Sequence, residues 1–253
     1  MRRLPFLASA ALIALLAPRA LLSQGGGGGP DEVPSNPWND GLMPGNYIRM
    51  SAGSATPVSP HAALRYWDRG QTYYAGWENW DTGSSGVSLV GFSLNASYSL
   101  LPLNTPLFLS SFAPVNGGTV TSATASRAGI LEVTSGIRVR MPVPYLMPNL
   151  SIGLGLIDWQ PGSIKYESTS GPGSAKQQHR VSGEFTVGAG IEKNLFDRYG
   201  VFGEALYVYG YTSYGSGFAT PGGVCNTSGC DAFRNGNTTI GTIRGGLRVR
   251  VGQ

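Results

Sequence analysis

The stretch TTIGTIRGGLRVRV, residues 238–251, alternates apolar and polar side chains with a period of two. Successive residues of a β-strand point to opposite sides of the sheet, so this alternation predicts a strand with two unlike faces. One face holds Thr239, Gly241, Ile243, Gly245, Leu247, Val249 and Val251. The other holds Thr242, Arg244, Gly246, Arg248 and Arg250. One face is therefore apolar and the other is strongly basic.

The same contrast recurs in earlier segments, whose charged faces mix both signs with Gly and Ser. Those faces, with the first and last strands, hold Arg49, Glu132, Arg138, Arg140, Glu184, Glu192, Glu204, Arg244, Arg248 and Arg250. A small shared lumen, facing away from lipid, has this composition. A secreted soluble β-barrel is the alternative, because it alternates too but buries its apolar face. The excess of arginine predicts that any weak conductance favours anions.

Eight runs of alternation follow the N-terminal region, each near or above the roughly 9–11 residues that a tilted strand needs to cross a membrane. They cover Tyr47–Val58, Val87–Leu100, Leu107–Val115, Ile130–Met141, Leu150–Trp159, Val181–Leu195, Val201–Tyr214 and Thr238–Val251. Long connections follow the odd-numbered runs and short ones the even-numbered runs. The layout predicts an all-β, eight-stranded antiparallel up-and-down transmembrane barrel.

The N-terminus predicts export. Arg2 and Arg3 precede an uncharged apolar stretch, Leu4–Ala17, which is typical of a secretory signal and too short for a membrane-spanning helix. We expect residues 1–23 to be the signal peptide, residues 24–44 a flexible Gly/Pro-rich leader and residues 45–253 the barrel. The 18 basic and 14 acidic residues give +4, but three of the arginines fall in the signal, so no nucleic-acid partner is expected.

Cys225 and Cys230 are the two cysteines of the chain, and only turn-forming residues separate them. In an exported protein this pair predicts a disulfide that closes a loop. A metal site is the competing interpretation, and two cysteines without a nearby His pair suit it poorly. No metal or other cofactor is expected.

The order of elements resembles the small outer-membrane barrels of the OmpA transmembrane-domain and OmpX type. The resemblance covers residues 45–253 and rests on Gly45–Arg49, Gly188–Glu192, Gly203–Tyr207 and Gly245–Val251. It implies a bacterial outer-membrane location, outer-membrane lipid as the surroundings and a monomer. Extracellular ligands could bind through the long loops.

Two features bear on chemistry. Some eight-stranded barrels are lipid A deacylases that use Ser, His and Glu, and His179, Ser182 and Glu184 lie close together in the sequence. His179 and Ser182 are three residues apart, however, and so point to opposite faces of a regular strand. His61 is the other histidine, and we expect no catalytic site.

An aromatic-rich segment suits either an interfacial belt or a sugar- or protein-binding surface. It holds Tyr66, Trp67, Tyr73, Tyr74, Trp77 and Trp80.

The sequence thus predicts an integral outer-membrane barrel with a structural or surface-interaction role, its lumen filled by an Arg/Glu network. A narrow pore for small solutes and a lipid-modifying enzyme are the alternatives.

Overall fold

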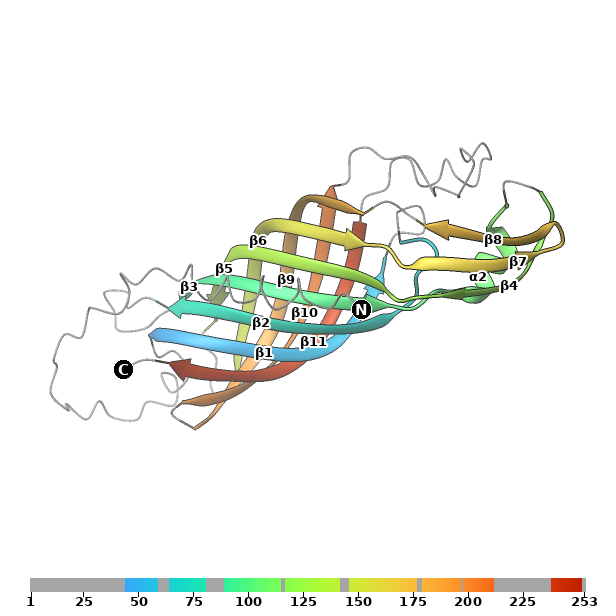
Figure 1. Ribbon diagram of the computed structural model, residues 1–253. Helices are drawn as coiled ribbons and strands as arrows, with labels where there is room; N and C mark the ends of the chain where they lie inside the picture. Colours follow the sequence, from blue (N-terminus) through green and yellow to red (C-terminus); the bar gives the residue numbers. More distant parts are fainter. Residues whose placement is uncertain are drawn as a thin grey trace, which may run out of the picture. The chain divides into compact units, whose positions relative to one another are not determined.

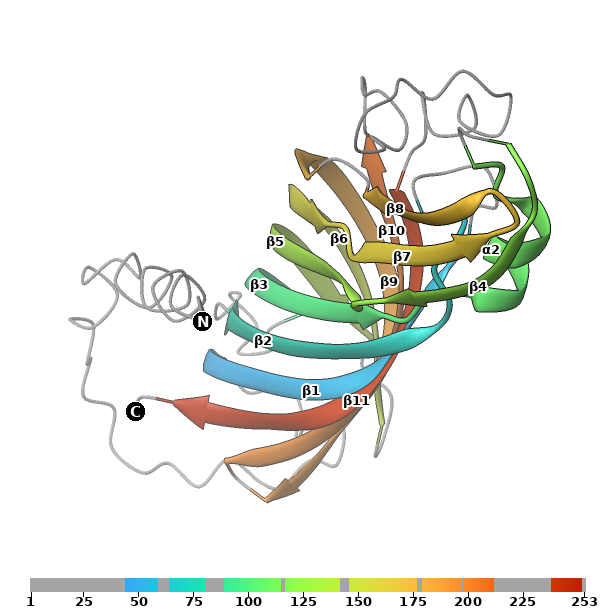
Figure 2. The same ribbon diagram turned by 45° about the vertical axis from the view of Figure 1, so that its right-hand side comes forward.

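A computed structural model describes residues 44–58, 64–80, 89–114, 117–141, 146–176, 179–196, 198–211 and 238–251. Eight long antiparallel strands close into a barrel in the order β1-β11-β10-β9-β6-β5-β3-β2. The barrel strands are β1 (Gly45–Pro57), β2 (Gly70–Trp80), β3 (Val90–Leu101), β5 (Ala128–Arg140), β6 (Met147–Gln160), β9 (Arg180–Phe196), β10 (Tyr199–Tyr211) and β11 (Thr238–Val251). Figures 1 and 2 show these strands tilted around a common axis. The predicted fold is confirmed.

Closure comes from the first and last strands of the barrel. β1 and β11 pair from Asn46 opposite Val251 to Pro57 opposite Ile240 without a register shift. A closed barrel has no unpaired strand edge, so its backbone groups are satisfied without water.

Two of the predicted strand positions are wrong. Residues 70–80 were expected in a loop but form β2, whose Thr72, Tyr74, Glu78 and Trp80 side chains are buried on one face. The predicted strand Leu107–Val115 is instead occupied by a short helix, α2 (Thr105–Ser111). One strand was missed and one was predicted where a helix lies, so the predicted count of eight strands is still right. The strand at residues 90–101 is the third strand of the barrel and not the second, so it runs in the direction opposite to the one predicted.

Helix α2 forms because its first turn is capped. The Asn104 side chain accepts a hydrogen bond from the Leu107 backbone N–H at 3.0 Å, and Pro106 lies in the first turn. An Asn cap and a proline at the start of a helix are both favourable. Phe108 and Phe112, four residues apart, stack with ring centroids 4.5 Å apart, so the apolar residues that suggested a strand pack at helical spacing.

A second, three-stranded sheet lies at one end of the barrel. It consists of β4 (Val120–Ala125), β7 (Ser163–Ser168) and β8 (Gly171–Lys176), in the order β4-β7-β8. We call residues 64–67, α2 and this sheet the outer cap. Figure 2 shows the sheet and α2 beyond the ends of the barrel strands.

The connections differ in length between the two ends of the barrel. The long segments 102–127, which contains α2 and β4, and 161–179, which contains β7 and β8, lie at the end with the outer cap. The connections 141–146 and 197–198 at the opposite end are short. Long connections mark the extracellular side of an outer-membrane barrel. The segment after residue 101 was expected to be a short turn; it is one of the long connections, because β2 shifts the alternation by one strand.

The predicted signal peptide, leader and Cys225–Cys230 disulfide lie outside the described residues and stay predictions. Among the residues that the structure describes, no helix is long and apolar enough to cross a membrane.

Candidate functional site: the barrel lumen

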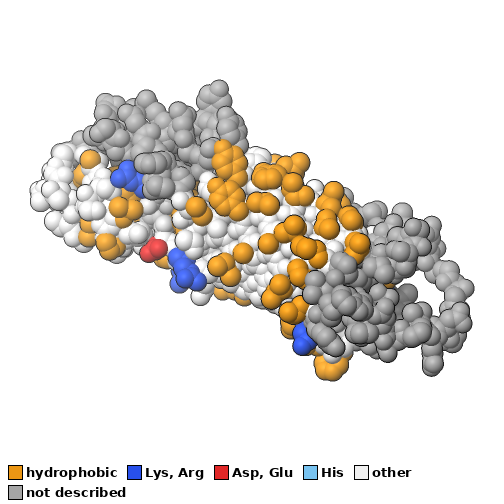
Figure 3. Space-filling view, turned by 180° about the vertical axis from the view of Figure 1, so that it is seen from behind, with side chains coloured by type: hydrophobic (Ala, Val, Ile, Leu, Met, Phe, Trp, Pro, Cys, Tyr) orange, Lys and Arg blue, Asp and Glu red, His pale blue; other side chains and the backbone are white. Residues whose placement is uncertain are grey.

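The outer wall of the barrel is apolar. Large hydrophobic side chains alternate along each strand and point away from the lumen; on β6 alone Leu154 is 65% exposed and Leu156 is 58% exposed. Figure 3 shows apolar side chains spread over one face of the wall. The exposed set on the strands includes Ile48, Met50, Phe92, Ile137, Leu150, Ile152, Val187, Ile191, Ile243 and Leu247. Exposure of this extent is unfavourable in water.

The inner wall carries buried charge, and the first half of its ion-pair network centres on Glu78 and Glu204. Arg49 on β1 donates from Nη1 to Glu78 Oε1 on β2 at 2.7 Å. Arg138 on β5 spans the lumen, with its Nε 3.0 Å from Glu78 Oε1 and its Nη1 2.9 Å from Glu204 Oε2 on β10. Asn149 on β6 accepts a further hydrogen bond from Arg138 Nη1 at 2.8 Å.

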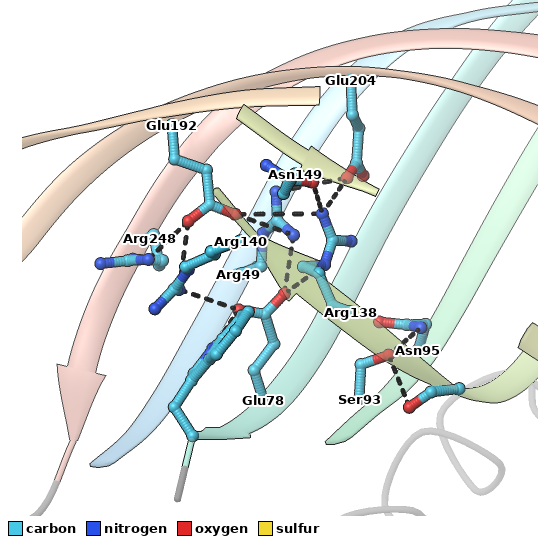
Figure 4. A network of polar contacts seen from close by, with 12 residues as sticks. Arg49, Glu78, Ser93, Asn95, Arg138, Arg140, Asn149, Glu192, Glu204 and Arg248 are labelled. Carbon is cyan, nitrogen blue, oxygen red and sulfur yellow. Dashed lines mark hydrogen bonds and ion pairs between the residues drawn. The ribbon is translucent and has the colours of Figure 1, made fainter. Parts of the chain in front are cut away.

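The second half of the network centres on Glu192 of β9. Its Oε2 lies 3.1 Å from Arg140 Nη2 and 2.5 Å from Arg248 Nη1 on β11. Arg140 Nη2 also lies 3.7 Å from Glu78 Oε2, which joins the two halves (Figure 4). These side chains come from six of the eight barrel strands, so the network crosses the lumen from wall to wall. We call these seven residues the charge layer: Arg49, Glu78, Arg138, Arg140, Glu192, Glu204 and Arg248.

Aromatic rings cover the faces of the guanidinium groups. The Arg140 guanidinium carbon lies 3.3 Å from the Trp80 ring centroid, and that of Arg49 lies 3.7 Å from the Phe202 ring centroid. The Trp80 indole Nε1 donates to Glu78 Oε2 at 3.0 Å. Flat guanidinium groups thus bind carboxylates at their edges and rings at their faces, which compensates for part of the cost of burying their charge.

The structure places all ten predicted lumen residues on the inner wall. Nine are buried, and Arg250 is half-buried at the end opposite the outer cap. Glu78 was missed, although it contacts three arginines and is fully buried. With Glu78 the inner wall holds six arginines and five glutamates, of which five and five are buried, so the arginine excess is smaller than predicted. The anion preference of any weak conductance stays a prediction.

On the side of the charge layer that faces the outer cap, the lumen contains a small cavity of about 30 Å³. Its lining includes Ser97, Glu132, Thr134, Glu184, Thr186 and Arg244. Arg244 donates from Nε to Glu204 Oε1 at 2.5 Å, and its guanidinium carbon lies 3.6 Å from the Tyr74 ring centroid. Glu132 accepts a hydrogen bond from Ser97 Oγ. The Glu184 carboxylate has no hydrogen-bond partner among the described residues.

The end of the lumen under the outer cap is filled by apolar side chains. Ala55, Leu101, Ile130, Ile157, Val208 and Ile240, from six barrel strands, belong to one buried cluster with the outer-cap residues Leu64, Tyr66, Trp67 and Phe108. Trp67 packs edge-on against Trp159 of β6 with ring centroids 6.0 Å apart. We call this cluster the apolar plug. Two layers of side chains therefore fill the lumen, the charge layer and the apolar plug. The small polar cavity lies between them.

The predicted aromatic-rich loop does not exist as one surface. Tyr66 and Trp67 are buried in the apolar plug, whereas Tyr74 and Trp80 point into the lumen and Tyr73 points outward. Trp77 packs against Phe92 with ring centroids 6.3 Å apart. The segment is partly a strand, which disperses its rings between the lumen and the outer wall.

His179, the histidine among the described residues, pairs with Asp158. His179 Nε2 lies 2.5 Å from Asp158 Oδ1, and the His179 side chain is largely exposed. Ser182 lies on the face of β9 that carries Glu184, because both are an even number of residues from Glu192. His179 precedes β9, and its partner Asp158 pairs in register with the outward-facing Val181, so His179 is held on the side opposite Ser182.

A closed barrel with an apolar outer wall and a charged, filled interior is a transmembrane β-barrel of the bacterial outer-membrane class. Neither a family model nor a curated protein matches the sequence.

Several solved structures have a similar fold. The Neisserial surface protein A is 11% identical, with a TM-score of 0.47, and the match covers 81% of this chain and 97% of that one. The outer membrane protein OprG from Pseudomonas aeruginosa matches with 12% identity, a TM-score of 0.43 and coverage of 85% and 99%. Ail, the attachment invasion locus protein of Yersinia pestis, matches with 12% identity, a TM-score of 0.39 and coverage of 81% and 99%.

Proposed function

We propose that this protein is a closed structural barrel of the bacterial outer membrane that holds an ordered outer cap at the cell surface. The observation that supports it most is that two layers of packed side chains, the charge layer and the apolar plug, fill the lumen. The charge layer joins six strands, and the apolar plug joins barrel strands to the outer cap.

A solute would have to separate the side chains of both layers to pass. Separating the charge layer is costly: for comparison, removing one member of a buried ion-pair network leaves an uncompensated charge and costs about 3–5 kcal/mol. The cavity between the layers, about 30 Å³, holds a water-sized molecule but no sugar or amino acid. A narrow pore, the alternative from the sequence, would need the network to rearrange.

A surface-interaction role is a second candidate, and the folded outer cap favours it. Phe112 packs edge-on against Tyr166 of β7 with ring centroids 5.3 Å apart, so α2 and the three-stranded sheet share a core. A cap whose core is continuous with the apolar plug presents a fixed surface to extracellular ligands. We assign no catalytic role, since His179 is paired with Asp158 on the face opposite Ser182.

Osmotic swelling of liposomes that contain the full-length protein tests the proposal. We expect these liposomes to swell in small sugars and amino acids at the rate of empty liposomes. Swelling that depends on solute size and rises with the amount of inserted protein would favour the pore instead.

A further inference from the structure

Two carboxylates converge in the middle of the lumen without enough positive charge around them. Glu132 on β5 and Glu184 on β9 both line the cavity above the charge layer. Both Glu184 oxygens are buried and lack a hydrogen-bond partner, as does Glu132 Oε1. Glu184 is only 5% exposed and has no ion pair with any residue that the structure describes. A buried carboxylate in this state is costly.

The arginines that line the same cavity are already bound to other groups. Arg138 and Arg244 both contact Glu204, at 2.9 and 2.5 Å. Five arginines thus serve the three carboxylates of Glu78, Glu192 and Glu204, whereas Glu132 and Glu184 form no ion pair with a described residue. The buried arginines and glutamates are equal in number, but the ion pairs do not include these two glutamates.

The wall between the two glutamates leaves space for a ligand. β6 lies between β5 and β9, and its inward positions facing the cavity are Ser151 and Gly153, so no bulky side chain enters there. A Cβ on Gly153 would lie 2.7 Å from Thr186 Oγ1, which shows how closely the hydroxyl approaches. Four residues with hydroxyl groups also line the cavity: Ser97, Thr134, Ser151 and Thr186.

We propose that Glu132 and Glu184 bind one hard divalent cation of the calcium class at this cavity. Carboxylate and hydroxyl oxygens are ligands for such ions, and calcium accepts irregular oxygen geometry whereas magnesium requires a near-octahedral shell. Among the described residues no three or more His, Cys, Asp or Glu side chains are grouped so that they could hold a metal ion, so the proposed site needs hydroxyls and water to complete its shell. The bound ion ties β5 to β9 across β6.

Isothermal titration calorimetry of the full-length protein in detergent, after removal of metals with a chelator, tests the site. We expect saturable binding of about one Ca²⁺ per barrel, with weaker binding of Mg²⁺. Glu184→Gln should lower the Ca²⁺ affinity by more than about tenfold, because even residues that only orient a metal ligand contribute that much. Glu167→Gln, an exposed change on β7, is the matched control and should bind as the wild type does.

Thermal unfolding provides a second readout. Ca²⁺ should raise the midpoint of the wild type and of Glu167→Gln, but not that of Glu184→Gln. Lack of saturable Ca²⁺ binding by the wild type would overturn the proposal and leave a proton shared between Glu132 and Glu184. Binding that persists unchanged in Glu184→Gln would also overturn it, since the ion would then lie elsewhere.

Discussion

Glu78 accepts a 2.7 Å hydrogen bond from Arg49, and neither side chain has any exposed surface. The pair joins β1 to β2 inside the lumen, and Arg138 and Arg140 extend it to β5. One glutamate therefore helps to hold three strands.

We expect Glu78→Gln to lower the free energy of unfolding by about 3–5 kcal/mol, because the arginines around it would keep a buried and uncompensated charge. Denaturant unfolding in detergent, followed by tryptophan fluorescence, measures the change. Glu167→Gln, on the exposed side of the outer cap, should unfold like the wild type. Equal stability of the two variants would show that the charge layer contributes little.

The two arginines of β11 at different depths should differ in the same assay. Arg244 is buried and bonded to Glu204, whereas Arg250 is half-buried at the far end of the strand, where it reaches water. Arg244→Ala should therefore destabilise the barrel clearly more than Arg250→Ala does. A larger effect at position 250 would contradict the depth argument.

The inward faces of most strands could be predicted because their buried residues are also their charged and polar residues. From residue 242 onward, β11 carries Thr, Gly or Arg at every second position, and the residues between them are Ile, Gly, Leu and Val. β2 gave no such contrast, because its inward face carries two large aromatic side chains and a single charge while Tyr73 and Trp77 lie among its other residues. Glu78 was missed for the same reason.

Helix α2 was missed because its seven residues, TPLFLSS, are too few to distinguish a helical period from the period of two of a strand. Asn104 and Pro106 carried the signal for a helix start. The ion pairs themselves could not be predicted from the sequence, since strand order and depth decide which arginine meets which glutamate. Glu184 shows this most clearly: its place on the lumen face was predicted, but its lack of a hydrogen-bond partner was not.

The outer cap should loosen without loss of the barrel when its core is cut back. Phe108 is fully buried and contacts Tyr66, Phe112 and Tyr166, so Phe108→Ala should cost about 3–5 kcal/mol locally. We expect proteases to cleave the cap faster while the barrel keeps its heat-dependent shift on gels. Phe92→Ala, on the outer wall, should leave cap cleavage unchanged. Loss of the gel shift in Phe108→Ala would mean that barrel and cap unfold together.

Cys225 and Cys230 should be oxidised in protein isolated from the envelope. The closed loop is short, so its gain by the loop-entropy model is at most about 2–3 kcal/mol and confined to loop order. Replacing both cysteines with serine should leave the unfolding of the barrel unchanged. Thiols that react with a maleimide in unreduced native protein would contradict the assignment.

Conductance across a planar bilayer tests the central claim, a lumen closed by the charge layer and the apolar plug, most directly. The wild-type protein, inserted at known density and checked for its heat-dependent gel shift, should give no steady channels. Large, stable and reproducible single-channel steps from the unmodified protein would contradict the account and place the pore ahead of the structural role.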